Sequence, residues 1–258
     1  MNISKVIKRI KIGEKKVVII FDDESKLEIR PNVYTEFNFF KGKAMSKKDI
    51  KEVEEVNQID EFVSYASKLC ASKSYTKSKI KEKLIKKGAN EAQCDKVIDV
   101  LIKYQLLDEK AFIKEYLEYA DYRKYGYNRI KDELYKKGLS SYQINNVKYD
   151  EKRDLTLARE LVKPYEKKYN KYSYSAMKSH IYTALLRQGY TYDVASKALE
   201  EVSPIDLKKE KELLKIEYQK AKRKYENKYG DKSSKEKIIQ YLLAKGFMYK
   251  DIISLKEE

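Results

Sequence analysis

One spacing of three residues recurs four times along the chain and restricts what the chain can fold into. In each copy an isoleucine stands eight residues before a glycine, and a leucine stands four residues before it. The four sets are Ile80, Leu84 and Gly88; Ile130, Leu134 and Gly138; Ile181, Leu185 and Gly189; and Ile238, Leu242 and Gly246. Successive glycines lie 50, 51 and 57 residues apart, which leaves room for three helices in each repeat.

Each set predicts a helix together with its end. Isoleucine and leucine four residues apart share one helix face, and a glycine can adopt the left-handed conformation that ends a helix. We call this element the glycine-terminated helix. Two residues further on come Asn90, Ser140 and Thr191, which are good N-caps, and Gln93 and Gln143 complete capping boxes. The pair is a helix-turn-helix, a motif that is purely structural in many proteins and contacts nucleic acid in others.

Three motifs in the second copy resemble the RecX family of bacterial recombination regulators. They are LLDEKAF at 106–112, YRKYGYNRI at 122–130 and KDELYKKG at 131–138. The resemblance implies a fold of three-helix units, and it implies control of the RecA recombinase filament on DNA in homologous recombination, DNA repair and the SOS response. The first copy departs from the pattern with SYTKSKI at 74–80, so residue roles transfer less directly there.

The predicted fold class is mostly α, a solenoid of tandem three-helix repeats behind a small β-rich N-terminal cap. Residues 1–45 form the cap, a β-meander with a short helix. Residues 46–104 form a linking helix and the first repeat, and residues 105–148, 149–201 and 202–258 form the other three repeats.

In the cap, the pattern predicts strands at 3–12, 16–21 and 26–30 and a helix at 33–40, with Phe37 and Phe40 packed on the sheet. Ser46 and Asp49 begin a helix that ends near residue 57, and another follows at 59–72. Further helices are predicted at 77–87, 91–104, 108–124, 127–137 and 142–148. The third repeat begins at residue 150 with a long helix that kinks or restarts at Pro164. Ser203, with Pro204 and Asp206 after it, caps the next long helix, which Gly230 breaks.

The net charge of +16 is carried by the repeats, because residues 1–60 hold 13 basic and 11 acidic side chains. Such a balance favours a polyanionic partner, and nucleic acid fits better than a membrane surface because no segment combines a strong apolar face with a dense basic one. Solubility combined with a lysine-rich composition is the alternative explanation.

The sequence offers no catalytic residues, cofactor or metal site. His180 is the single histidine and suits a surface or packing role, since it has no partner for a triad or a metal. Cys70 and Cys94 fall on apolar helical positions and are predicted to be reduced core residues. No glycine-rich phosphate loop occurs. The absence of a membrane segment and of a signal peptide predicts a soluble, cytoplasmic protein, which we expect to be a monomer.

Basic and aromatic residues gather between the first helix of each repeat and its glycine-terminated helix. The clusters occupy residues 73–75, 123–127, 171–174 and 228–230. There, Lys and Arg can bind phosphates while Tyr stacks on bases, although a tyrosine can equally be core. The candidate DNA- or filament-binding residues are Arg123, Lys124, Tyr125, Arg129, Lys136, Lys137, Lys86, Lys87 and Arg187. Of these, Arg123 and Arg129 also match the family motif. The lysines and Arg187 lie near helix C-termini, where the helix dipole alone favours cations.

These features predict a non-enzymatic regulator that binds the RecA filament and single- or double-stranded DNA. Two alternatives remain open. One is a general DNA- or RNA-binding module, and the other is a helical scaffold for protein interactions, which would lack salt-sensitive affinity for nucleic acid.

Because no set of residues supports hydrolysis, we expect the purified protein alone to show neither ATPase nor nuclease activity. ATP hydrolysis and cleavage of a labelled oligonucleotide are the measurements. Turnover that persists through purification and rises with protein concentration would contradict this expectation.

Overall fold

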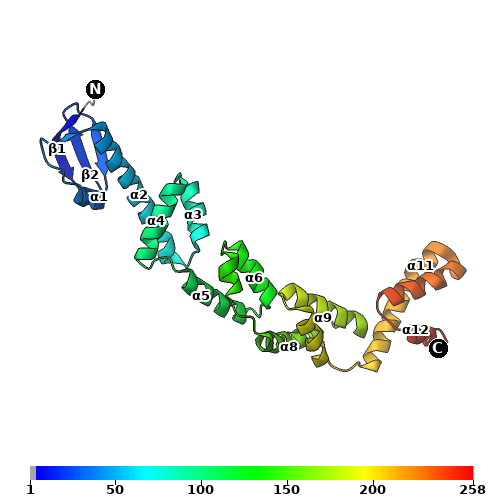
Figure 1. The fold of residues 1–258 in the computed structure, drawn as a ribbon. Coiled ribbons are helices and arrows are strands. Elements are labelled where there is room, and N and C mark those ends of the chain that lie inside the picture. Colours follow the sequence, from blue (N-terminus) through cyan, green and yellow to red (C-terminus); the bar gives the residue numbers. More distant parts are fainter. Residues whose placement is uncertain (1–3, 258) are drawn as a thin grey trace. The chain divides into compact units, whose positions relative to one another are not determined.

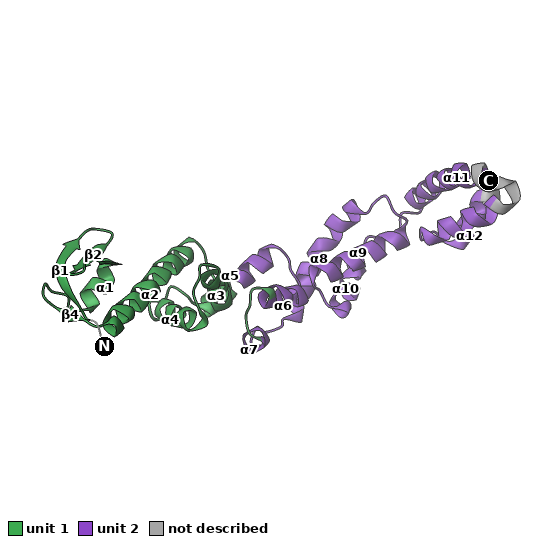
Figure 2. Ribbon diagram, turned by 90° about the horizontal axis from the view of Figure 1, so that it is seen from above, with its two compact units in different colours: residues 1–115, 136–140 green, residues 116–135, 141–258 purple. Residues whose placement is uncertain are grey.

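The computed structural model describes residues 4–257, apart from the side chains of residues 227–233, 256 and 257. By its contacts the chain forms two compact units (Figure 2). Residues 1–115 and 136–140 form unit 1, and residues 116–135 and 141–258 form unit 2. The elements below carry the labels of Figure 1.

The N-terminal sheet has four antiparallel strands, one more than the sequence predicts. They are β1 (Lys5–Ile12), β2 (Val17–Phe21), β3 (Lys26–Ile29) and β4 (Ala44–Met45), in the order β3-β2-β1-β4. β4 pairs with the start of β1, where Lys5 faces Met45. A strand of two residues is too short to produce a hydropathy pattern, so the sequence shows only the other three.

A short helix and one phenylalanine close the core under this sheet. α1 (Pro31–Glu36) begins at the proline and buries Val33. Phe37 is partly buried here, as predicted. The prediction for Phe40 is wrong, because Phe39 is 7% exposed and stacks on Tyr34, whereas Phe40 is 54% exposed.

α2 (Lys47–Ser72) is one helix of 26 residues where the sequence predicts two. Its start is confirmed, since Ser46 and Asp49 form the predicted capping box. Neither glycine nor proline occurs within it, so nothing forces a break near residue 57. Instead, Asn57 accepts a 2.8 Å hydrogen bond from the backbone N–H of Arg30. The first half of α2 therefore packs on the sheet, and the second half packs in the first repeat.

The helices of the first three repeats follow the predicted order. They are α3 (Lys77–Lys86), α4 (Glu91–Lys103), α5 (Glu109–Tyr122), α6 (Tyr127–Lys136), α7 (Ser141–Asn145), α8 (Glu151–Lys168), α9 (Tyr174–Gln188) and α10 (Tyr192–Ala198), with a 3-10 turn at Leu199–Glu201. α7 is shorter than predicted. α8 continues through Pro164, so a restart of the helix there is wrong.

The repeated spacing has the predicted structural meaning. The backbone φ angle is positive at all four glycines, 101° at Gly88, 83° at Gly138, 99° at Gly189 and 86° at Gly246. The isoleucine and leucine of every set are at most 3% exposed. The N-caps at Asn90, with its capping box, and at Thr191 are also confirmed.

The fourth repeat departs most from the prediction. α11 (Leu207–Ala244) is capped by Asp206, and Ser203 instead contacts Glu166 of α8. The hydroxyl of Tyr241 donates to Glu217 at 2.9 Å. Since 24 residues of straight helix span about 36 Å, the chain must reverse direction within α11. The predicted break at Gly230 is wrong, because α11 continues through this residue. α12 (Tyr249–Glu257) follows.

Two of the repeat glycines allow a matched test of this geometry. A Cβ at Gly88 would meet nothing within 4 Å, so Gly88→Ala should cost only the left-handed penalty, about 1–2 kcal/mol. A Cβ at Gly138 would lie 2.3 Å from Oγ of Ser78. Gly138→Ala should therefore cost a further ~1–3 kcal/mol from overpacking. Chemical denaturation measures both, and equal losses would show that the contact at Gly138 does not constrain the fold.

Candidate nucleic-acid interface

Each of the three described junctions between consecutive repeats joins the start of one glycine-terminated helix to the end of the next. The donor is the residue just before one glycine-terminated helix. The acceptor is a carbonyl at the end of the next such helix, on the residue just before its glycine. The donors are Thr76 Oγ1 to Lys137 O at 2.5 Å, the Gly126 N–H to Gln188 O at 3.0 Å, and Ser173 Oγ to Lys245 O at 2.6 Å. These bonds satisfy carbonyls that a helix end leaves unpaired.

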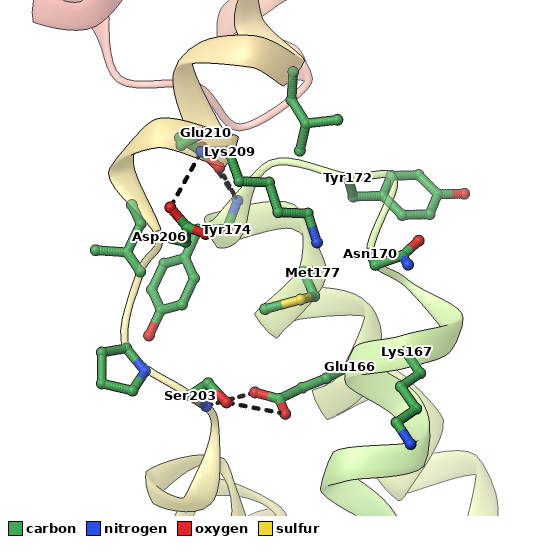
Figure 3. A pocket seen from close by; sticks show the side chains of 13 residues that line it. Glu166, Lys167, Asn170, Tyr172, Tyr174, Met177, Ser203, Asp206, Lys209 and Glu210 are labelled. Atoms are coloured by element: carbon green, nitrogen blue, oxygen red, sulfur yellow. Dashed lines mark hydrogen bonds between the residues drawn. The ribbon is translucent and has the colours of Figure 1, made fainter.

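A carboxylate from the first helix of the following repeat completes each junction. It accepts a hydrogen bond from the first N–H of the glycine-terminated helix in the preceding repeat. The pairs are Lys77 to Glu109 at 2.9 Å, Tyr127 to Asp154 at 3.0 Å, and Tyr174 to Glu210 at 2.9 Å. Figure 3 shows the last of these beside the pocket between α8, α9 and α11. Each carboxylate thus accepts a hydrogen bond from an N–H that a helix start leaves unpaired.

The middle junction contains the motif at residues 122–130, and two glycines make it possible. A Cβ on Gly126 would lie 2.4 Å from the carbonyl carbon of Gly189, and a Cβ on Gly189 would lie 2.3 Å from Cβ of Arg129. Two backbone carbonyls also accept hydrogen bonds across this contact. The carbonyl of Arg123 accepts a hydrogen bond from the side-chain amide of Gln188 at 2.9 Å. The carbonyl of Lys124 accepts from the hydroxyl of Tyr190 at 2.8 Å. The motif is therefore, first of all, a packing motif.

Tyr125 lies inside this junction and does not offer a stacking surface. Its side chain is 6% exposed, and the guanidinium carbon of Arg129 lies 3.9 Å from the ring centroid. The guanidinium of Arg123 lies 6.0 Å from the same centroid. The idea that Tyr125 stacks on a base is corrected by this burial, because both guanidinium groups already occupy its surroundings.

Some of the other candidate cations at this junction already bind side chains of the protein, and others are exposed. Arg129 donates to the side chain of Gln188 at 3.2 Å, and Lys124 forms an ion pair with Glu160 at 2.7 Å. Arg123 is exposed, and so is Arg187 at the end of α9. The structure thus gathers the predicted residues of the middle junction, but only part of the set faces solvent.

In unit 1, the candidate lysines lie at the ends of α3 and α6. Lys86 is exposed and pairs with Glu82 at 2.7 Å, and the exposed Lys87 lies 5.9 Å from the ring of Tyr65. Lys136 is exposed, whereas Lys137 is half-buried with its Nζ 5.9 Å from the ring of Phe112.

Sequence reasoning missed two lysines of this group, Lys79 and Lys83, and it named Lys73 only as part of the cluster at residues 73–75. Lys73, Lys79 and Lys83 line one cavity together with Lys86 and Lys137. The helical spacing of residues 79, 83 and 86 places them on one face, and this was the signal available in the sequence.

The described residues hold no group of three or more His, Cys, Asp or Glu arranged for a metal ion. The ring of His180 lies 5.3 Å from that of Tyr169 and 4.3 Å from that of Tyr172, which fits a packing role. Cys70 and Cys94 are free thiols, and burial raises the pKa of both. Among the described helices, none has the length and apolar character needed to cross a bilayer.

Known proteins resemble this chain over most of its length, although no family model matches it. The regulatory protein RecX of Lactococcus lactis subsp. lactis is 28% identical over 242 residues, which cover 91% of this chain and 89% of the relative. The regulatory protein RecX of Listeria monocytogenes serotype 4a is 25% identical over 244 residues, with 93% and 90% covered. A crystal structure of regulatory protein RecX superimposes with a TM-score of 0.67 at 18% identity, covering 76% of this chain and 99% of that chain. The structural likeness confirms the fold class.

The junction acid Glu210 gives the fourth repeat a pH-dependent stability. Burial, with a contribution from the nearby Asp251, raises its pKa. A raised pKa in the folded state means that its contribution is fully present at low pH and is lost as pH rises through that pKa. Glu210→Gln keeps an oxygen acceptor for Tyr174 and cannot titrate. We therefore expect urea denaturation of the variant to lack the fall in stability that the wild type shows as pH rises above the ordinary pKa of a glutamate.

Glu210→Ala is the control for the hydrogen bond itself. It leaves the N–H of Tyr174 without its acceptor and should cost about 1–3 kcal/mol relative to Glu210→Gln at every pH. Identical pH profiles for the wild type and Glu210→Gln would show that another group causes the pH dependence.

Proposed function

We propose that this chain, which belongs to the RecX family of regulatory proteins, binds the RecA filament on DNA and alters its activity without catalysing a reaction. The observation that carries the proposal is the similarity to proteins named regulatory protein RecX over about nine-tenths of the chain.

The charge of the chain supports nucleic acid as part of the partner. The net charge is +16, and the candidate cations lie at helix ends and junctions, where they can reach a phosphate backbone. Arg123, Lys87 and Arg187 are the best placed, because each is exposed and forms no ion pair within the described residues. Lys124 and Arg129 contribute charge from within the middle junction.

The second candidate function is a general nucleic-acid-binding module. The same net charge favours it, and it would bind DNA in the same salt-dependent way. It differs from the first candidate in one measurable respect, since it would leave the recombinase unaffected.

The experiment that separates the two titrates this protein into RecA on single-stranded DNA and follows ATP hydrolysis and strand exchange. A regulator changes both activities, and the effect saturates as the protein approaches the concentration of RecA. If the protein binds the DNA while both activities stay unchanged, the general binding module is correct.

Replacing Arg123, Lys87 and Arg187 together by alanine should weaken DNA binding and make it less dependent on salt. Each phosphate contact on single strands contributes about 0.7 to the slope of log affinity against log salt, so three lost contacts should flatten it by ~2. Fluorescence anisotropy over a salt series measures the slope.

The matched control replaces Lys11, Lys15 and Lys26 of the N-terminal sheet, which are also exposed and form no ion pair within the described residues. Lys5 and Lys8 are unsuitable, because they pair with Asp23 and Glu24. Equal flattening in both triple variants would mean that the total charge alone determines binding.

A further inference from the structure

Unit 1 contains a cavity of about 360 Å³ whose lining is strongly basic. It lies between α3, the segment before α3, Phe112 of α5 and Lys137 after α6. Five lysines line it, Lys73, Lys79, Lys83, Lys86 and Lys137, and Glu82 is the one acid among its lining residues. The positive charge therefore exceeds the negative charge by four.

The charge of Glu82 is already neutralised within the cavity. It pairs with Lys79 at 2.8 Å and with Lys86 at 2.7 Å, and these bonds lower its pKa to about 2. In the described part of the chain, Lys73 and Lys83 have no carboxylate within ion-pair distance. Their amines instead lie 5.0 and 5.6 Å from the ring centroid of Tyr75.

Other cavities of the described residues lack this excess of positive charge. Four further cavities in the described residues carry at least as many carboxylates as cations, and the one in Figure 3 has Glu166, Asp206 and Glu210 against Lys167 and Lys209. The start of α3 is not itself the anion site, because Thr76 and Glu109 already accept its backbone N–H groups. The lysine amines are thus the groups that attract a ligand.

We infer that this cavity binds a phosphate of a nucleic-acid backbone through Lys73 and Lys83, with the rings of Tyr75 and Phe112 at its border. Charge-assisted hydrogen bonds to phosphate oxygens are strong, and a basic groove with aromatic side chains is how proteins hold single strands. The inference deepens the nucleic-acid part of the proposed function and rests on it. It moves the centre of DNA contact in unit 1 to lysines outside the family motifs.

The test compares Lys73→Ala/Lys83→Ala with the control Lys11→Ala/Lys15→Ala in the full chain. Anisotropy of a labelled single-stranded oligonucleotide over a salt series should show a slope flatter by ~1.4 for the cavity variant, from two lost contacts, and a smaller change for the control. Lys73→Arg/Lys83→Arg keeps the charge and should restore the slope. Circular dichroism checks that each variant is folded. Equal effects of the cavity and control variants overturn the inference.

Competition with tripolyphosphate separates the two sources of phosphate. If wild type binds tripolyphosphate through these lysines while oligonucleotide binding ignores them, the site serves a free polyphosphate and the assignment to nucleic acid is wrong. The RecA assays on the same variants separate this inference from the proposed function. If the wild type regulates RecA but the cavity variant binds DNA as the wild type does, only the inference about the cavity is wrong. Lysine-dependent DNA binding by a wild type that leaves RecA unchanged refutes only the proposed function.

Discussion

The repeats depend on a hydrogen bond that the carbonyl just before the glycine accepts in three of the four glycine-terminated helices. A helix end leaves carbonyls unpaired, and the glycine directs the chain away before another turn can form. In the three described junctions, the preceding repeat supplies the missing donor, and the following repeat supplies a carboxylate for the helix start. The two middle helices, α6 and α9, are therefore satisfied at both ends by other repeats.

This constraint explains why the motif at residues 122–130 serves packing before it can serve binding. Gly126 is required because the chain passes against Gly189, and Arg129 covers the ring of Tyr125 and reaches Gln188. The exposed Lys73 and the half-buried Lys83 lie beside the ring of Tyr75 and pair with no carboxylate in the described part of the chain, so the fold does not depend on their charge.

The helices and their ends could be predicted because their causes are local. The periodic isoleucine and leucine, the left-handed glycines, and the caps at Ser46, Asn90 and Thr191 each depend on a few neighbouring residues. The failures have distant causes. β4 depends on pairing with β1, and the burial of Phe39 depends on Tyr34. Ser203 donates a hydrogen bond to Glu166, which lies 37 residues earlier in the chain. The candidate site shows the same division, since its charge follows from the sequence whereas the burial of Tyr125 requires the fold.

The carboxylate that completes each junction lies later in the chain than the helix start to which it binds, so it is also synthesised later. Glu109, Asp154 and Glu210 lie 32, 27 and 36 residues after the N–H groups that they accept. On a ribosome, a glycine-terminated helix emerges before its acid, so its first turn stays hydrated until the next repeat arrives. Each repeat is thus finished by its successor, and synthesis from the N-terminus adds order one junction at a time. A nascent chain paused between repeats would present a helix start whose first N–H still lacks its carboxylate acceptor.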